Sequence, residues 1–314
     1  MNRRQTIPKE LRYTFQQFDQ EFPTDDACLE AIKEQRFPEG KTDCHKCLKS
    51  LKHYRVKGRT AYACEKCGNH IYPLAGTIFE KSSTPLRIWF HAMYLMGSTR
   101  CGISAKQIQR ETGVTYKTAW RMFHQIRKLM SEDVKLGGAG GSGVEMDEMY
   151  HGGRRKSQSG RMLAADCDKK VIVMGIVERE GRIVARVTPE LTRLGAFSFV
   201  KECVLPATVI FTDEAAIYHG LPKLEGQNYQ HRRINHSQKI YVTGDVHTNT
   251  IEGFWSLVKR GIGGVYHSVS AKYLQSYLDE YSFRYNRRDS GNLVFSSILQ
   301  RVGEMASCKP ASEA

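Results

Sequence analysis

The sequence predicts a multi-domain α/β protein, and three observations along its 314 residues support this prediction. Four of the nine cysteines are clustered between positions 44 and 67. A stretch of helical periodicity follows over residues 84–130. Beyond the glycine-rich stretch LGGAGGSG, strand-like segments come first and then alternate with helical ones, which is typical of a mixed sheet. We therefore expect a small cysteine-rich domain, a helical segment and a larger mixed-sheet domain.

The clustered cysteines form two CxxC pairs. Cys44 and Cys47 make the first pair, and Cys64 and Cys67 make the second after sixteen intervening residues. The residues between the pairs alternate like a hairpin that turns at residues 57–58. Each CxxC turn brings two sulfurs to one side of an ion, and four thiolates bind Zn²⁺ tetrahedrally. This pattern predicts a zinc ribbon with one structural Zn²⁺, which supplies much of the folding energy of so small a domain.

Other interpretations of the cysteines carry less weight. A redox dithiol is one alternative, and unrelated thiols are another. His45 and His53 lie near the ribbon and could replace a ligand, but four thiolates already fill a tetrahedral site. The remaining cysteines are interpreted as thiols without a special role: Cys28, Cys101, Cys167, Cys203 and Cys308.

The helical stretch contains helix-turn-helix spacing in the segment SAKQIQRETGVTYKTAWRMFHQIRKL. Ser104 can cap a first helix, Gly113 provides the turn, and Ala119 lies on the inner face of a second helix. The second helix is then a recognition helix that contacts DNA with its first residues. An ordinary helical hairpin in a core remains the alternative.

The composition favours a polyanionic partner. The net charge is +14, and the isoelectric point is near 9.3; nucleic acid is the usual partner of so basic a chain, although a solvated basic surface is also common. No run of 18 or more apolar residues exists, and the charged N-terminus lacks an apolar signal segment. We therefore expect a cytoplasmic, nucleoid-associated protein with no membrane partner.

Three acidic residues are candidates for chemistry in the mixed-sheet domain. Asp147 lies in the first strand, Asp213 ends a second strand 66 residues later, and Glu252 follows 39 residues beyond on the polar face of a helix. Carboxyl ends of strands gather ligands in open sheets, and hard oxygen ligands suit Mg²⁺ or Mn²⁺. A pair of such ions about 4 Å apart would support phosphoryl transfer. Periodicity does not exclude their neighbours Glu145, Glu148 and Asn249.

The helix that carries Glu252 has two opposed faces. An apolar stripe consists of Ile251, Phe254, Trp255 and Val258, which we interpret as core. Lys259 shares the polar side with Glu252, two turns further along, and is either a phosphate contact or a solvated lysine.

The chain as a whole resembles bacterial insertion-sequence transposases of the DDE class, in particular those with an N-terminal zinc ribbon and an ISXO-like transposase domain. The matching motifs run in order from CHKC…CEKC through VEMDEMYHGG and VIFTDEAAIY to HTNTIEGFWSLVKRGIGGVYH. The resemblance implies an RNase H-like catalytic domain whose acids are Asp147, Asp213 and Glu252, with Lys259 as the basic residue seven positions later. Some relatives use asparagine in the third role, which keeps Asn249 open.

The resemblance implies a Mg²⁺-dependent DNA transposase that binds terminal inverted repeats, cleaves 3′ ends and transfers strands. We expect a homodimer or higher oligomer on double-stranded DNA, both transposon ends and target. A DNA-binding regulator with an inactive transposase-like domain is the alternative, and a nuclease without strand transfer is a third possibility.

The expected domain organisation has five parts: an N-terminal helix and zinc ribbon (1–80), a helix-turn-helix segment (81–135), a glycine-rich linker (136–143), a catalytic domain (144–290) and a C-terminal tail (291–314). The residues expected to contact DNA are Thr115, Tyr116, Lys117, Thr118, Arg121, Arg154, Arg155, Lys156, Lys259 and Arg260.

Overall fold

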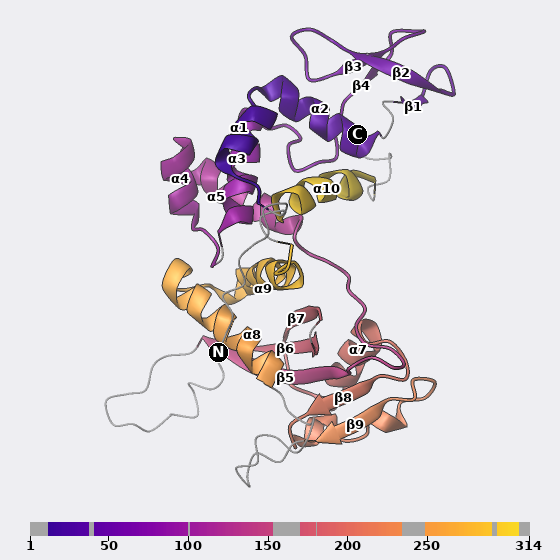
Figure 1. The fold of residues 1–314 in the computed structure, drawn as a ribbon, viewed down its shortest axis with the longest axis vertical. Coiled ribbons are helices and arrows are strands. Elements are labelled where there is room, and N and C mark those ends of the chain that lie inside the picture. Colours follow the sequence, from indigo (N-terminus) through magenta and orange to yellow (C-terminus); the bar gives the residue numbers. More distant parts are fainter. Residues whose placement is uncertain are drawn as a thin grey trace. The chain divides into compact units, whose positions relative to one another are not determined.

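The structure is a computed structural model that describes residues 12–37, 41–99, 101–152, 170–179, 181–233, 249–290 and 294–307 (Figure 1). The chain divides into two compact units. The first unit consists of Met1–Met130 together with Arg287–Ala314, and the second consists of Ser131–Asn286. Within the described residues, no helix has both the length and the apolar character that a membrane crossing requires.

The first unit begins with helices α1 (Phe15–Glu21) and α2 (Asp25–Arg36). The Oγ1 atom of Thr24 accepts a hydrogen bond from the amide of Ala27, so Thr24 is the N-cap of α2. An N-terminal helix was expected before the ribbon, and α2 occupies that place. Its buried residues Cys28, Leu29 and Ile32 follow helical spacing, so one face of α2 packs into the core of the unit.

A four-stranded antiparallel ribbon follows α2. Its strands are β1 (Lys41–Cys44), β2 (Lys49–Arg55), β3 (Tyr62–Cys64) and β4 (His70–Ile71), in that spatial order. The hairpin between β2 and β3 turns at Gly58, whose φ of 75° favours glycine, as the sequence predicts. The hydroxyl of Tyr62 donates to Glu30 at 2.6 Å, and the guanidinium of Arg55 donates to Asp26 at 2.6 Å. These bonds attach one face of the ribbon to α2.

The remaining helices of the first unit are α3 (Leu86–Ser98), α4 (Ala105–Thr112), α5 (Tyr116–Lys128) and α10 (Val294–Ser307). Helices α4 and α5 are joined by three residues. Gly113 ends α4 with a φ of 71°, and the side chain of Thr115 caps α5 by accepting from the amide of Thr118. Ile108 and Ala119 are fully buried on the inner faces of α4 and α5.

Helix α10 differs from the C-terminal tail that was expected over residues 291–314. Phe295, Ile298 and Val302 are buried at helical spacing, and α10 packs against α2 and α3 within the first unit (Figure 1). This apolar stripe has the period of an amphipathic helix, and its burial stabilises the helix although the last residues of the chain are mostly polar.

The second unit is built on a five-stranded mixed sheet. Its strands are β5 (Val144–Gly152), β6 (Lys170–Glu178), β7 (Ile183–Thr188), β8 (Val209–Thr212) and β9 (Gln230–Arg233), and their spatial order is β7-β6-β5-β8-β9. Strand β5 pairs antiparallel with β6, β6 pairs antiparallel with β7, and β8 is parallel to both β5 and β9. The mixed α/β class predicted for this region is confirmed, although β9 was not anticipated.

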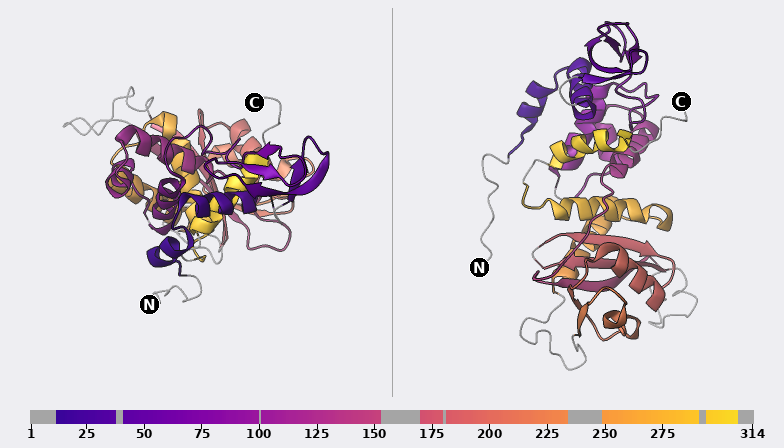
Figure 2. Two further views of the ribbon diagram at one scale, coloured as in Figure 1. Left: turned by 90° about the horizontal axis from the view of Figure 1, so that it is seen from above. Right: turned by 90° about the vertical axis from the view of Figure 1, so that its right-hand side faces the viewer.

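Helices cover both faces of this sheet. Helix α7 (Arg193–Cys203) packs with Val144 and Met146 of β5 in one apolar cluster. Helices α8 (Asn249–Gly261) and α9 (Ala271–Asn286) pack with Met149 of β5 in a second cluster on the opposite face, as Figure 2 shows. Side chains alternate along a strand, so neighbouring residues of β5 contribute to different faces. A π-helical turn, Ile262–Tyr266, follows α8.

The glycine-rich segment 136–143 differs from the free linker that was expected. Leu136 is fully buried, its amide donates to the Cys203 carbonyl at 2.7 Å, and its carbonyl accepts from the Leu205 amide at 2.9 Å. The unit boundary lies earlier, between Met130 and Ser131. Glycines permit the turns of this segment, but Leu136 joins it to the end of α7.

Candidate metal and active sites

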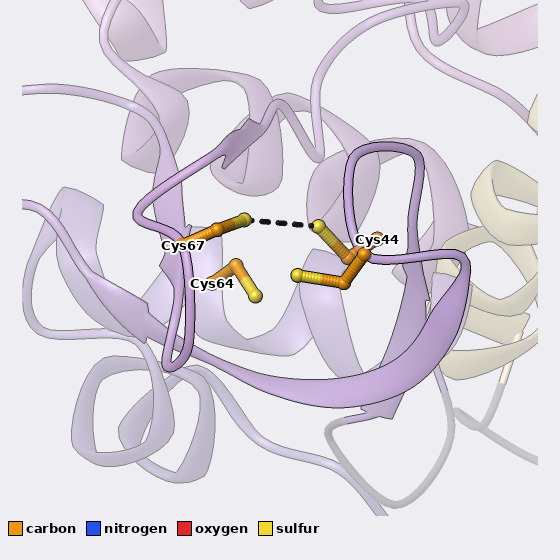
Figure 3. Close-up of side chains that lie close together, drawn as sticks. Cys44, Cys64 and Cys67 are labelled. Atoms are coloured by element: carbon orange, nitrogen blue, oxygen red, sulfur yellow. Dashed lines mark hydrogen bonds between the residues drawn. The ribbon is translucent and has the colours of Figure 1, made fainter.

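The four predicted zinc ligands lie together in the ribbon of the first unit. The sulfurs of Cys44, Cys47, Cys64 and Cys67 lie within 4.8 Å of one another, and those of Cys44 and Cys67 are 3.4 Å apart. Figure 3 shows the side chains of Cys44, Cys64 and Cys67 converging from the two CxxC turns. Four convergent thiols fit a tetrahedral Zn²⁺ with no open position, so the ion that fits here is structural.

The two neighbouring histidines do not belong to this group. His45 is exposed. His53 is 3% exposed, and its Nδ1 lies 3.0 Å from the carbonyl of Leu51. Within the described residues, these four cysteines are the possible metal ligands that converge in a group of three or more.

Asp147 is positioned by β5 on the face of the sheet that α8 covers. Its Oδ2 accepts a hydrogen bond of 3.0 Å from Nε1 of Trp255, one turn beyond Glu252 on α8. Gly175 lies opposite Asp147 on β6, and a Cβ atom there would approach the Trp255 ring to 2.6 Å. The indole fits against the sheet because Gly175 has no side chain. Trp255 was predicted to be core and is 4% exposed, but its bond to Asp147 was not anticipated.

Asp213 is the first residue after β8, which is the parallel neighbour of β5. Val144 pairs with Ile210 and Glu145 with Phe211. Continuing this register by two residues places Asp147 beside Asp213, at the usual strand separation of about 4.8 Å. Burial, together with the nearby charges of Glu148 and Asp213, raises the pKa of Asp147 from 3.8 to about 6. The fold therefore brings the first two predicted acids together at the centre of the sheet.

Glu148 is the next residue of β5, on the face of the sheet that α7 covers, and the sequence interpretation did not select it. The buried hydroxyl of Tyr218 donates to its Oε2 at 2.6 Å. Burial, followed by the charge of Asp213, raises the pKa of Glu148. Burial and the same group of acids raise the pKa of Tyr218. The sequence signal for Tyr218 was its position as the last residue of the motif VIFTDEAAIY, which ends in a 3₁₀ turn.

Glu252 and Lys259 lie on the exposed side of α8, as predicted from its periodicity. Asn249 is the first residue of this helix and is exposed as well. The carboxylates of Asp147, Asp213 and Glu252 are not all within 4.8 Å of one another among the described residues. The Trp255–Asp147 bond places α8, the helix that carries Glu252, over the face of the sheet on which Asp147 lies.

The predicted DNA-contact residues fall into three groups. Tyr116, Lys117 and Arg121 are exposed on α5, whereas the side chains of Thr115 and Thr118 bond to each other at the start of that helix. Lys259 and Arg260 are exposed in the last turn of α8. Arg154, Arg155 and Lys156 lie outside the described residues.

Comparison with known proteins identifies two family domains in this chain. The transposase zinc-ribbon domain matches residues 23–70, and the ISXO2-like transposase domain matches residues 135–286. The chain is also 30% identical over 265 residues to an uncharacterized protein in the transposable element ISH50 of Halobacterium salinarum, an alignment that covers 79% of this chain and 85% of that protein.

These matches define the class of protein as a transposase that has a zinc ribbon before its transposase domain. Within this class, the chain belongs to the ISXO2-like transposase family. The family resemblance inferred from the sequence motifs is thereby confirmed.

Proposed function

We propose that this protein binds the terminal inverted repeats of an insertion sequence, cleaves their 3′ ends in a divalent-metal-dependent reaction and joins them to target DNA. The observation that carries the proposal is the adjacency of Asp147 and Asp213 on the parallel strands β5 and β8. Membership of the transposase family supports the same reaction. The sheet order β7-β6-β5-β8-β9, with β6 antiparallel to its neighbours, supports an RNase H-like interpretation of the domain.

The acids fit a hard divalent cation. Asp147 is mostly buried, and its raised pKa reflects the burial of a charge near two other carboxylates. Carboxylate oxygens are the ligands that Mg²⁺ and Mn²⁺ prefer. When bound, such ions would activate the attacking oxygen and stabilise the leaving oxygen of the scissile phosphate. Ligands of two different ions need not approach each other as closely as ligands of one ion, so Glu252 is proposed as the third ligand.

The chain's own residues then have separate roles. Asp147 and Asp213 would hold the divalent ions at the centre of the sheet. Trp255 orients the Asp147 carboxylate through its 3.0 Å bond. Lys259 presents a positive charge two turns beyond Glu252 on α8, where it would bind a DNA phosphate.

DNA binding is proposed for the helix-turn-helix of α4 and α5. The first turn of α5 is well formed because Thr115 caps it, and Tyr116, Lys117 and Arg121 project outward. The amino end of a recognition helix is the part that enters the major groove. The net charge of +14 supports binding to the phosphate backbone. Two transposon ends must be joined together, so we propose a homodimer or higher oligomer on DNA.

The experiment that tests the proposal incubates the full chain with DNA that carries the element's ends and Mg²⁺, and measures 3′-end nicking. We expect the wild-type protein to nick, and we expect Asp147→Asn and Asp213→Asn to be inactive. Asp279→Asn is the matched control, because Asp279 is another mostly buried acid with a raised pKa, on α9. It should nick like the wild type.

Equal nicking by all of these variants would contradict the assigned chemistry. Specific binding without any nicking, even by the wild type, would instead support a DNA-binding regulator with an inactive domain. A second assay with pre-cut ends and target DNA measures strand transfer, and nicking without joining would identify a nuclease.

A further inference from the structure

Glu145 is a buried carboxylate that the proposed reaction does not use. It lies in β5 two residues before Asp147, and its side chain is 0% exposed. Its two oxygens accept at least four hydrogen bonds. Three come from the start of α8: the Thr250 amide at 2.9 Å, the Thr250 hydroxyl at 2.9 Å and the Ile251 amide at 3.0 Å. The fourth comes from Nε of Arg179 at 3.1 Å.

These contacts make Glu145 the cap of a distant helix. The first amides of an α-helix lack partners within the helix, and the positive end of the helix dipole favours an anion there. The usual cap is the side chain of the residue that precedes the helix. Here the carboxylate comes from a strand, 105 residues before Thr250. Such a long-range cap fixes where α8 begins on the sheet, and so fixes the position of Glu252 in the first turn of that helix.

Arg179 connects Glu145 to β8, the strand that leads to Asp213. Its guanidinium carbon lies 3.7 Å from the centre of the Phe211 ring, while its Nε donates to Glu145. Phe211 is in β8, two residues before Asp213. The group therefore contacts three elements: β5, which contains Asp147; β8, which ends immediately before Asp213; and α8, which contains Glu252. We call Glu145, Arg179, Phe211, Thr250 and Ile251 the Glu145 anchor.

We propose that Glu145 is a positioning residue whose anchor holds the three proposed metal ligands in register. This inference rests on the proposed function, because it assigns the anchor a role in that metal site. A displacement of about 1 Å in a catalytic group can abolish most of its effect. Residues that orient metal ligands through other contacts commonly change metal affinity by about 10-fold to 100-fold when they are replaced.

The test compares Glu145→Gln with Glu280→Gln. A glutamine at position 145 keeps the shape of the side chain, but one of its two oxygens becomes an amide nitrogen, which donates and does not accept, so the hydrogen bonds made to that oxygen are lost. Glu280 is the matched control, because it is also 0% exposed and is paired with an arginine, Arg284, at 2.6 Å. It lies on α9, outside the Glu145 anchor. Both substitutions remove a buried, paired carboxylate from the same unit.

Two measurements on the full chain distinguish positioning from general stability. The first is hydrogen exchange of the peptide that covers residues 249–261, and the second is Mn²⁺ binding measured by electron paramagnetic resonance. For Glu145→Gln we expect faster exchange in α8 and Mn²⁺ binding weaker by at least about 10-fold. For Glu280→Gln we expect unchanged Mn²⁺ affinity. Asp147→Asn provides the reference for loss of the metal site.

Arg179→Lys is the second variant, for use if Glu145→Gln does not fold. It keeps the positive charge but loses the planar group that both bonds Glu145 and stacks on Phe211. We expect it to weaken Mn²⁺ binding severalfold while the fold is retained. Unchanged Mn²⁺ affinity and α8 exchange in a folded variant of either residue would overturn the proposal.

The failure of this inference can be distinguished from failure of the proposed function. If wild-type Mn²⁺ binding is lost in Asp147→Asn but kept in Glu145→Gln, the metal site stands and the positioning role is wrong. If Asp147→Asn binds Mn²⁺ like the wild type, the proposed metal site is wrong and the positioning role falls with it. If Glu280→Gln weakens Mn²⁺ binding as much as Glu145→Gln, the effect is general destabilisation, and the positioning role is overturned.

Discussion

The ribbon of the first unit and the acid cluster of the second unit are two metal-site candidates built in opposite ways. The ribbon's four cysteines come from two short knuckles, and their sulfurs lie within 4.8 Å of one another in the chain alone. The acids are separated by 66 and 39 residues in the sequence, and Asp147 and Asp213 lie side by side on neighbouring strands. Among the described residues, the carboxylates of Asp147, Asp213 and Glu252 do not all lie within 4.8 Å of one another. One set of ligands is gathered by local turns, and the other depends on the packing of a whole sheet and helix.

This difference follows from the chemistry of the ligands. Each CxxC turn fixes two sulfurs through the local backbone, and neutral thiols can approach one another without an ion. Charged carboxylates repel one another, and burial further destabilises their charged form. Both effects raise the pKa values of Asp147 and Glu148. A structural ion can therefore be anticipated from spacing, whereas a catalytic site needs supporting contacts such as Trp255 and Glu145.

The largest effect is expected at the ribbon. Cys64→Ser should remove one of four thiolates and with it the zinc that stabilises a domain with little core. Structural zinc contributes an apparent binding free energy of about 10–16 kcal/mol in zinc-finger peptides, so the ribbon should unfold. The measurements are zinc content per chain and hydrogen exchange over residues 41–71. Cys101→Ser, at an exposed cysteine, is the control. A Cys64→Ser protein with one tightly bound zinc and native exchange would contradict the assignment.

Asp147→Asn should abolish nicking and yet increase the free energy of unfolding of the metal-free protein. The pKa of Asp147 is raised to about 6 in the folded chain, from 3.8, so the folded state retains a proton that the unfolded chain has lost. The resulting stability is present below about pH 4 and is lost as the pH rises through about 6. Without metal, Asp147→Asn should therefore be more stable than the wild type above that pH, by up to about 3 kcal/mol, because each pKa unit is worth about 1.4 kcal/mol.

Denaturant unfolding at pH 4 and pH 8 with a chelator present measures this difference. The gain of Asp147→Asn should appear at pH 8 and be small at pH 4. If the variant is less stable than the wild type at pH 8, the charge of Asp147 does not destabilise the folded state. In the nicking assay, wild-type activity should fall below about pH 6, because the protonated carboxyl is a poor metal ligand.

Gly175→Ala should disturb the contact that attaches α8 to Asp147. The new Cβ would lie 2.6 Å from the Trp255 ring, so the indole must move and its bond to Asp147 should weaken. Overpacking of this kind costs about 1–3 kcal/mol, which thermal unfolding and tryptophan fluorescence would report. Gly253→Ala on α8 is the matched control, because nothing lies within 4 Å of its added Cβ. It should stabilise the helix by about 0.5–1 kcal/mol. Identical fluorescence and melting in Gly175→Ala and the wild type would refute the close approach.

The smallest effect is expected for Lys259→Ala. Loss of one phosphate contact should weaken DNA binding modestly and reduce the slope of log affinity against log salt by about 1. Filter binding or fluorescence anisotropy at several salt concentrations measures this slope. Lys201→Ala, at an exposed lysine on α7, is the control and should leave the slope unchanged. An unchanged slope in Lys259→Ala would support the alternative of a solvated lysine.

The elements that the sequence predicted well carry strong local signals. The ribbon hairpin, the α4–α5 turn at Gly113 and the apolar face of α8 follow from CxxC spacing, a positive-φ glycine and helical periodicity. These features depend on residues that are near one another in the chain.

The features that the sequence did not predict depend on long-range contacts. Strand β9 is short and consists entirely of polar residues, and it is identified by its pairing with β8. The role of Glu145 depends on a helix that begins more than a hundred residues later, and that of Tyr218 depends on Glu148 across 70 residues. Periodicity alone could not show which of Glu145, Asp147 and Glu148 belongs to the active site. The environment of each side chain depends on whether α7 or α8 covers its face of the sheet, and the local sequence does not show this.

The central claim is that Asp147, Asp213 and Glu252 share divalent ions when the protein holds DNA. A crystal structure of the full chain with its element's ends and Mn²⁺ tests this directly through anomalous scattering. We predict manganese peaks within coordinating distance of all three carboxylates, with the scissile phosphate beside them. Manganese bound elsewhere, or a Glu252 side chain that remains apart from the ions in the DNA complex, would contradict the account.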